Sequence, residues 1–258
     1  MRWLALAVSL TLAGCAGIAR DRIYLPDPAP ASAPAWRTEA PRPVTVRTAD
    51  GLEIGGYYWP PEGEARDILV FFHGNAGNRE RAALMAEPLR RPGSGVLVAS
   101  YRGYGANPGR PSEPGLVADA AAFLAEARRL QPGSKVHLFG YSLGGSLALQ
   151  LAAREEVERV ATLGAFARLA DQAPAITRGL LPDRFDNLAA IANVAEPVFL
   201  FHGTADEVVP YAAAERLRTA SGGRATVVTL NGGGHQIDFG RLAPFLWRAL
   251  DGLGQPGS

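Results

Sequence analysis

A serine lies between two glycines at the point where an apolar segment ends and a helical segment begins. The stretch KVHLFGYSLGG covers residues 135–145, and Ser142 follows its apolar part directly. Gly140 and Gly144 stand two residues to either side, where side chains would crowd a tight turn between a strand and a helix. Such a turn lifts the serine hydroxyl out of the backbone surface. That position suits attack on a carbonyl carbon and has no obvious use in packing.

A serine hydroxyl is a weak nucleophile near neutral pH, so it needs a base to take its proton. The chain has four histidines. His235 is the best base, because it follows the last predicted strand on a glycine-rich loop. Standing alone, it would be interpreted as a solvated loop histidine. His137 lies within a predicted strand and is expected in the core, while His73 and His202 each end a predicted strand.

An imidazole base works best when a carboxylate fixes its tautomer and stabilises the imidazolium. Asp206, in HGTADEVVP, comes just beyond the end of a predicted strand. Pro210 is expected to open the next helix, so either Asp206 or Glu207 could instead be a charge at the helix N-terminus. Because it stands at the strand end, we assign Asp206 the role of the acid and leave Glu207 the helix-terminal role.

Attack on a carbonyl also needs two N–H groups that receive the developing negative charge. The Leu143 N–H, at the start of the helix after the serine, is one candidate. The other should come from the glycine-rich loop HGNAGN at residues 73–78. Asn75 is our choice there, with Gly74 or Ala76 as alternatives. Removing one such donor typically costs about 3–4 kcal/mol of transition-state stabilisation.

Alternating and apolar segments predict the elements that position these groups. Residues 44–59 form two alternating segments about Asp50-Gly51, which indicates a hairpin. Near-continuous apolar strands then alternate with helices, which indicates a mostly parallel sheet covered on both faces. Strands are expected near residues 67–74, 95–103, 135–140, 159–166, 197–203 and 226–230. Reactive groups on such a sheet gather where its strands end.

The motifs HGNAGN, SYRGYG, GYSLGG, HGTADEVVP and GGGH, in this order and spacing, resemble the α/β-hydrolase superfamily and are similar to its Bem46-like serine hydrolases. The resemblance covers residues 44–250. It implies an eight-stranded sheet, no cofactor or metal, and esterase or thioesterase activity with Ser142, Asp206 and His235 as triad. In that family the YRGYG loop lies beside the active site, so for Tyr101 and Tyr104 both packing and substrate contact stay open.

An insert at residues 165–194 occupies the place of the lid in this fold. Its apolar residues could line an acyl-chain groove or pack on the domain, and they are Phe166, Leu169, Ile176, Leu180, Leu181 and Phe185. The insert is too short for a large cap domain, which predicts an open site for small to medium acyl esters. The tentative substrate contacts are His73, Gly74, Tyr101 and Phe166.

The N-terminal residues predict export. Residues 1–14 are an apolar run after Arg2, too short to span a bilayer, and they read as a signal peptide. LAGC, ending in the only cysteine, resembles a bacterial lipobox, which predicts lipidation of Cys15 on the extracytoplasmic side of the cell envelope. An ordinary secretory signal or an uncleaved anchor is the alternative. Residues 15–43 hold six prolines from Pro26 onward and predict a tether of roughly 50 Å, on which Trp36 could dock or lie loosely.

Composition limits the remaining functions. Without Arg2 the chain has 25 basic and 25 acidic residues, from totals of 26 and 25, and the basic residues are scattered. Nucleic-acid binding is therefore not expected, and no obligate protein partner is evident. The sequence predicts a hydrolase domain at residues 44–252 that cleaves carboxylic esters through an acyl-enzyme. A thioesterase or a lipid or protein deacylase with the same triad, and a non-catalytic lipoprotein scaffold, are the alternatives.

Overall fold

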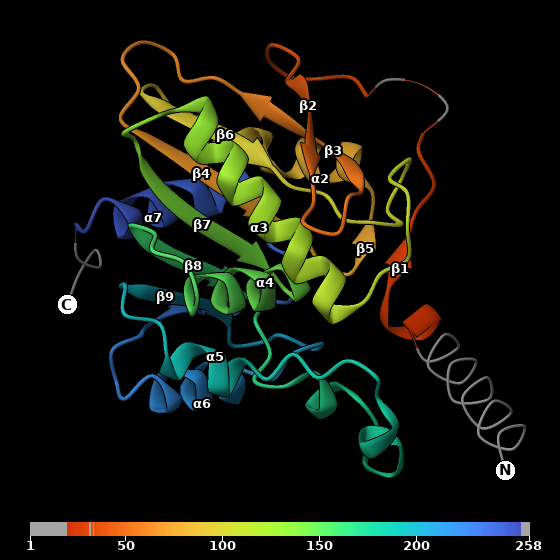
Figure 1. The fold of residues 1–258 in the computed structure, drawn as a ribbon. Coiled ribbons are helices and arrows are strands. Elements are labelled where there is room, and N and C mark those ends of the chain that lie inside the picture. The colour runs from red at the N-terminus through yellow and green to blue at the C-terminus, as the bar shows by residue number, and fades with distance from the viewer. Residues whose placement is uncertain (1–19, 31, 33, 254–258) are drawn as a thin grey trace, which may run out of the picture.

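An eight-stranded sheet forms the centre of this computed structural model, which describes residues 20–30, 32 and 34–253 (Figure 1). In chain order its strands are β2 (Arg42–Arg47), β3 (Glu53–Trp59), β4 (Asp67–Phe72), β6 (Ser94–Val98), β7 (Lys135–Tyr141), β8 (Arg159–Leu163), β9 (Val198–Gly203) and β10 (Thr226–Leu230). Their order in the sheet is β10-β9-β8-β7-β4-β6-β3-β2. Neighbours run parallel except β3, which is antiparallel to both β2 and β6. The predicted mostly parallel sheet of eight strands is confirmed.

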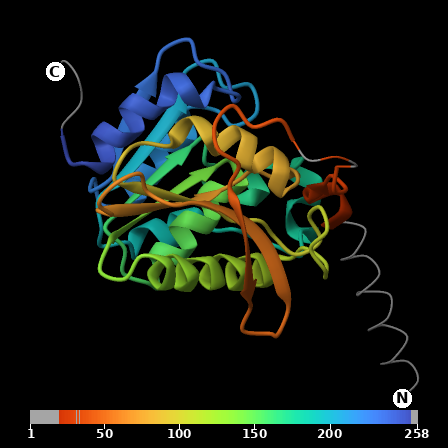
Figure 2. The same cartoon turned by 90° about the horizontal axis from the view of Figure 1, so that it is seen from above.

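Helices cover both faces of the sheet, as expected from the alternation of strands and helices (Figures 1 and 2). One face carries α3 (Glu113–Leu130), α4 (Leu143–Ala152), α5 (Asn187–Ala192) and α6 (Ala212–Ala220). The other carries α2 (Arg79–Ala86), a 3-10 turn at Glu87–Leu89, and α7 (Phe239–Leu250). No helix within the described ranges is long and apolar enough to cross a membrane.

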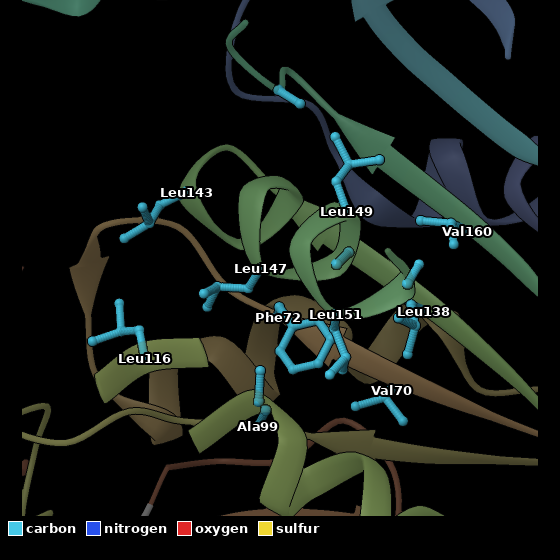
Figure 3. Close-up of a cluster of buried hydrophobic side chains, with 14 of the residues drawn as sticks. Val70, Phe72, Ala99, Leu116, Leu138, Leu143, Leu147, Leu149, Leu151 and Val160 are labelled. Carbon is cyan, nitrogen blue, oxygen red and sulfur yellow. The ribbon is translucent and has the colours of Figure 1, made fainter. Parts of the chain in front are cut away.

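Strand β4 lies at the centre of the core and has no exposed side chain between Ile68 and Phe72. Its residues alternate between two apolar clusters: Ile68, Val70 and Phe72 face α3 and α4, while Leu69 and Phe71 face α2 and α7. Figure 3 shows the first cluster, in which Phe72 packs beside side chains of α4. Each fully buried side chain of this size contributes roughly 1.5–3 kcal/mol. The ends of β4 and of its partner β7 are therefore rigidly placed.

The predicted insert contains little regular structure. Two short 3-10 turns, Leu169–Gln172 and Ala175–Leu180, precede α5. The Asn187 side chain fixes the end of the insert, because its Nδ2 donates to Ser146 Oγ at 2.7 Å and to the Phe166 carbonyl at 2.8 Å. Phe185 is fully buried, whereas Ile176 and Leu180 are 89% and 76% exposed. The apolar residues of the insert therefore divide between packing and exposure.

The segment before β2 departs from the expectation of an extended tether. Tyr24 is buried, and β1 (Leu25–Pro26) pairs in parallel with β5 (Ala76–Gly77) in a small second sheet. Trp36 packs edge-on against Tyr57 and Trp59, both at 5.8 Å between ring centroids. Proline-rich sequence favours a free, extended tether, but here tertiary contacts hold the segment against the domain. The predicted signal peptide and Cys15 lie outside the described residues.

Two buried histidines predict a loss of stability in acid. Burial lowers the pKa of both His73 and His137 to about 4, against about 6.5 in an unfolded chain. Between these values the unfolded chain binds protons that the folded chain does not, so stability falls as the pH falls from about 6.5 to about 4. Each group contributes up to about 1.4 kcal/mol per pH unit. We expect His137→Leu to reduce this pH dependence in urea unfolding compared between pH 7.5 and pH 5.

Leu138→Ala is the matched control for His137→Leu, because Leu138 is also a buried residue of β7. It should lower the free energy of unfolding by a similar amount at both pH values, since it removes packing and no titratable group. An unchanged pH dependence in His137→Leu would contradict this account.

Candidate active site

Three side chains from three separate loops meet at the carboxyl ends of the parallel strands. Ser142 follows β7, Asp206 follows β9 and His235 follows β10. His235 Nε2 lies 3.1 Å from Ser142 Oγ, and its Nδ1 lies 2.8 Å from Asp206 Oδ2. With the Nδ1–H donated to Asp206, Nε2 is free to accept the serine proton. The structure thus brings together the three residues that the sequence analysis selected separately.

Ser142 occupies a strained turn between β7 and α4. Its φ is 53° and its ψ is −115°, a conformation that costs free energy in a non-glycine residue. The turn is held closely: a Cβ on Gly144 would lie 2.0 Å from the Phe72 carbonyl oxygen, and one on Gly140 would lie 2.2 Å from the Gly144 carbonyl oxygen. Both glycines of the motif are therefore required by close backbone approach, as the sequence suggested.

Asp206, and not Glu207, is the carboxylate that contacts the imidazole. Asp206 Oδ1 accepts hydrogen bonds from the backbone N–H groups of Val208 and Val209, at 2.9 and 2.7 Å. This leaves Oδ2 for His235, and the Asp206 side chain is only 1% exposed. Glu207 Oε2 lies 3.4 Å from the backbone N of His235 and does not reach its ring. This geometry agrees with the assignment of Asp206, and not Glu207, as the partner of the imidazole.

His202, near the end of β9, supports the loop that carries Asp206 from the core side. Its Nε2 lies 2.8 Å from the Val209 carbonyl oxygen and 3.4 Å from Asp206 Oδ2. The shorter contact identifies the Nε2–H as a donor to Val209. The His202 side chain is buried, at 1% exposure. Its position supports the turn that presents Asp206.

The two candidate oxyanion donors lie beside this group. Neither the Leu143 N–H nor the Asn75 N–H donates to an acceptor within the part of the chain that the structure describes. Asn75 is fixed on several sides. Its Nδ2 donates to the Ile23 carbonyl at 3.0 Å, and its own carbonyl accepts from the Leu25 N–H at 2.9 Å and the Tyr104 hydroxyl at 2.8 Å. Both loops can therefore present preorganised N–H groups to a negative charge.

A cavity of about 1540 Å³ opens over the serine. Its lining includes Ser142 and His235, together with three of the tentative substrate contacts, which are His73, Gly74 and Phe166. Much of the remaining lining is apolar and comes from the N-terminal segment, α2, the insert, the loop after β9 and the loop before α7, namely Ile23, Met85, Leu169, Leu180, Leu181, Val208, Val209 and Ile237. The apolar part of this lining could hold an acyl chain.

Tyr101, the fourth tentative substrate contact, does not line this cavity. It is fully buried, stacks on the His73 ring at 4.2 Å between centroids, and donates its hydroxyl to the His73 carbonyl at 2.7 Å. Tyr104 is also buried, and its hydroxyl donates a hydrogen bond to the Asn75 carbonyl. The two tyrosines support the loop that carries the candidate donor. The sequence analysis left both packing and substrate contact open for Tyr101, and in the structure Tyr101 packs in the core.

Sequence reasoning missed two parts of the site. Tyr141, next to the serine, lines the cavity and packs against His235 with ring centroids 5.3 Å apart. Burial, with Asp206 and Glu207 nearby, raises the pKa of Tyr141 to about 12. The N-terminal residues Arg22 and Ile23 also line the cavity. Tyr141 could have been found as a neighbour in the GYSLGG motif, whereas nothing local marks the N-terminal contacts. No cluster of metal-binding side chains occurs among the residues described.

Comparison with known proteins places the chain in a family. Residues 67–190 match the model of the alpha/beta hydrolase fold, and residues 182–241 match that of TAP-like protein. Rv2307c of Mycobacterium tuberculosis is 36% identical over 84% of this chain and 80% of its own length. YfhR of Escherichia coli is 30% identical, over 76% and 70%. Protein bem46 of Schizosaccharomyces pombe is 30% identical, over 65% and 61%.

Solved structures show the same fold. The esterase domain of a Rhodothermus marinus protein aligns with a TM-score of 0.62 at 22% identity, over 82% of this chain and 96% of that one. A Xanthomonas campestris serine hydrolase without a lid aligns with a TM-score of 0.61 at 20% identity, over 85% and 95%. The chain belongs to the α/β-hydrolase superfamily and, within it, to the Bem46-like proteins.

Gly164, at the end of β8, offers a sharp test of the site geometry. Its φ is +62°, and a Cβ there would lie 3.0 Å from both Cε1 and Nδ1 of His235. Gly164→Ala must displace the imidazole by a few tenths of an ångström. We expect hydrolytic activity to fall about tenfold or more, since small misplacements of catalytic groups are costly.

Gly133→Ala is the matched control for Gly164→Ala. Gly133 has a φ of +79° with nothing near the added Cβ, so it imposes comparable backbone strain, about 1–2 kcal/mol, away from the site. Both variants should lose stability in thermal unfolding, but only Gly164→Ala should lose activity. Equal activity of the two variants would show that Gly164 does not set the His235 position.

Proposed function

We propose that the protein is a serine hydrolase that cleaves carboxylic esters through an acyl-enzyme. The observation that carries this proposal is the hydrogen-bonded line from Asp206 through His235 to Ser142, with distances of 2.8 and 3.1 Å. A non-catalytic scaffold would need neither a strained serine nor a carboxylate dedicated to an imidazole. The scaffold reading is therefore disfavoured.

The geometry supports a two-step reaction. Ser142 Oγ attacks the ester carbonyl carbon while His235 Nε2 takes the hydroxyl proton, and the carbonyl oxygen becomes negative between the Leu143 and Asn75 N–H groups. The intermediate collapses, the bond to the alcohol oxygen breaks, and His235 returns the proton to that oxygen. Water then attacks the acyl-Ser142 ester in the same way, and the acid leaves. Asp206 stabilises the imidazolium in both steps.

Thioester and lipid-acyl hydrolysis by the same triad remains the second candidate. The apolar lining of the cavity favours it, because an acyl chain is common to esters, thioesters and acylated lipids. A series of p-nitrophenyl esters of graded acyl length, assayed beside matching thioesters, separates these activities. Higher kcat/KM for the thioesters would favour the second candidate.

Replacement of the serine tests the proposed nucleophile. Ser142→Ala should lower kcat toward p-nitrophenyl esters by on the order of 10⁴–10⁶ and should abolish labelling by a fluorophosphonate probe. Ser134→Ala, in the turn before β7, should keep both properties. A wild-type protein that takes up no probe, or a Ser142→Ala variant labelled as fast as wild type, sinks the proposal.

We also propose that the mature chain is a lipoprotein of the bacterial cell envelope, anchored through Cys15. The support is the LAGC motif after an uncharged apolar run. Cys15→Ser should prevent incorporation of labelled fatty acid in cells, because the thiol is the only group in the motif that can carry the lipid. Continued labelling of the Cys15→Ser chain would reject lipidation at this residue.

A further inference from the structure

Exposed apolar side chains gather around the mouth of the active-site cavity. Eight large apolar residues in the described part of the chain are exposed, and six of them line the cavity or lie within two positions of a lining residue: Leu25, Leu84, Met85, Ile176, Leu180 and Val208. We call these six the apolar rim. The other two, Phe245 and Leu253, lie along α7 and after it. Exposed apolar groups concentrated at one site mark an interaction surface.

The rim is continuous with the interior of the cavity. Met85, Leu180 and Val208 belong to both, since they are exposed and also line the cavity. Ile176 lies between the lining residues Pro174 and Leu180 on the insert, and Leu84 precedes Met85 on α2. A molecule with an apolar tail could therefore pass from the rim to Ser142 along an apolar path.

The described chain enters the domain beside this mouth. Arg20 binds Asp183 of the insert with two hydrogen bonds of 2.9 Å, and Tyr24 donates its hydroxyl to the same carboxylate at 2.9 Å. Burial and the nearby Asp183 raise the pKa of Tyr24, so it stays a donor. Figures 1 and 2 both show residues 20–23 next to the insert. The buried Tyr24–Asp183 contact therefore fixes where the described chain begins on the surface of the domain.

This fixed entry places the proposed anchor near the mouth. Only five peptide units separate Cys15 from Arg20, and they can span at most about 18 Å. A lipid on Cys15 would thus hold the apolar rim close to the bilayer. The roughly 50 Å spacer expected from the sequence would have allowed any orientation, whereas the contacts of residues 20–28 do not.

The charged residues of the lining are mixed. Arg22, Arg81 and Asp238 are exposed, and Arg81 is paired with Asp27 at 2.6 Å. The exposed Arg178 lies on the insert between the lining residues Pro174 and Leu180. Exposed arginines beside exposed apolar side chains are typical of a surface that lies in the interface of a bilayer.

We propose that the apolar rim docks on a lipid bilayer, so that the cavity opens toward the membrane and takes acyl esters directly from it. This inference rests on the proposed esterase function and names its substrate class. The bilayer is favoured over a protein partner because the described chain begins at Arg20, which binds the insert that borders the cavity, and a lipid on Cys15 could be no more than five peptide units away.

The test compares one reaction in solution with the same reaction at a membrane. The whole chain is assayed with p-nitrophenyl acetate in solution and with p-nitrophenyl palmitate embedded in phosphatidylcholine vesicles. Ile176→Asp and Leu84→Asp place a charge on two separate parts of the rim, and neither residue lines the cavity. We expect each to lower the rate on vesicles about tenfold while the acetate rate changes less than twofold.

Phe245→Asp is the matched control, since Phe245 is also exposed, at 46%, but lies in α7 outside the cavity lining. It should leave both rates unchanged. Equal vesicle rates for wild type and both rim variants would overturn the inference, as would equal losses on both substrates, which would mean that the rim serves the cavity alone. Absence of acetate hydrolysis by the wild type would instead overturn the proposed function.

Discussion

The site depends on the close approach of the backbone between β4 and the start of α4. Gly144 leaves no space for a side chain against the Phe72 carbonyl, and this close contact holds Ser142 at its strained, positive φ. The same approach brings the loop after β4, with Asn75, beside the Leu143 N–H. One packing constraint therefore sets the position of the hydroxyl and of both candidate oxyanion donors. The strain at Ser142 is maintained because the buried strands on both sides are rigid.

A second feature is that both oxygens of the Asp206 carboxylate have hydrogen-bond partners. One oxygen accepts two backbone N–H groups and the other faces His235, while His202 supports the turn from the core. A carboxylate with this many donors is held in one orientation and stays ready to stabilise an imidazolium. The low exposure of Asp206 strengthens that interaction, since few water molecules compete with it.

Local sequence predicted the eight strands and the three residues at their carboxyl ends, because strand patterns, glycine positions and the parallel topology together determine where such residues meet. It could not predict the contacts of the N-terminal segment. Tyr24 and Asp183 are 159 positions apart, and neither residue carries a local signal for the other. The proline-rich composition did not predict the strand pair with Ala76–Gly77. Tyr101 was misplaced for a similar reason, since a motif places a residue near a site without showing whether its side chain faces the cavity or the core.

The N-terminal segment links parts of the site that are distant in sequence. Its Ile23 and Leu25 backbone groups bind both the side chain and the carbonyl of Asn75, and its Arg20 and Tyr24 bind Asp183 of the insert. Any force on the chain before Arg20 would therefore act on the loop that carries a candidate oxyanion donor and on the insert that borders the cavity. Because Asp183 is buried, losing these partners would leave a charge without compensation, so the segment is held more firmly than its composition suggests. The placement of the Asn75 amide and the proposed orientation of the cavity toward a membrane then depend on the same few hydrogen bonds.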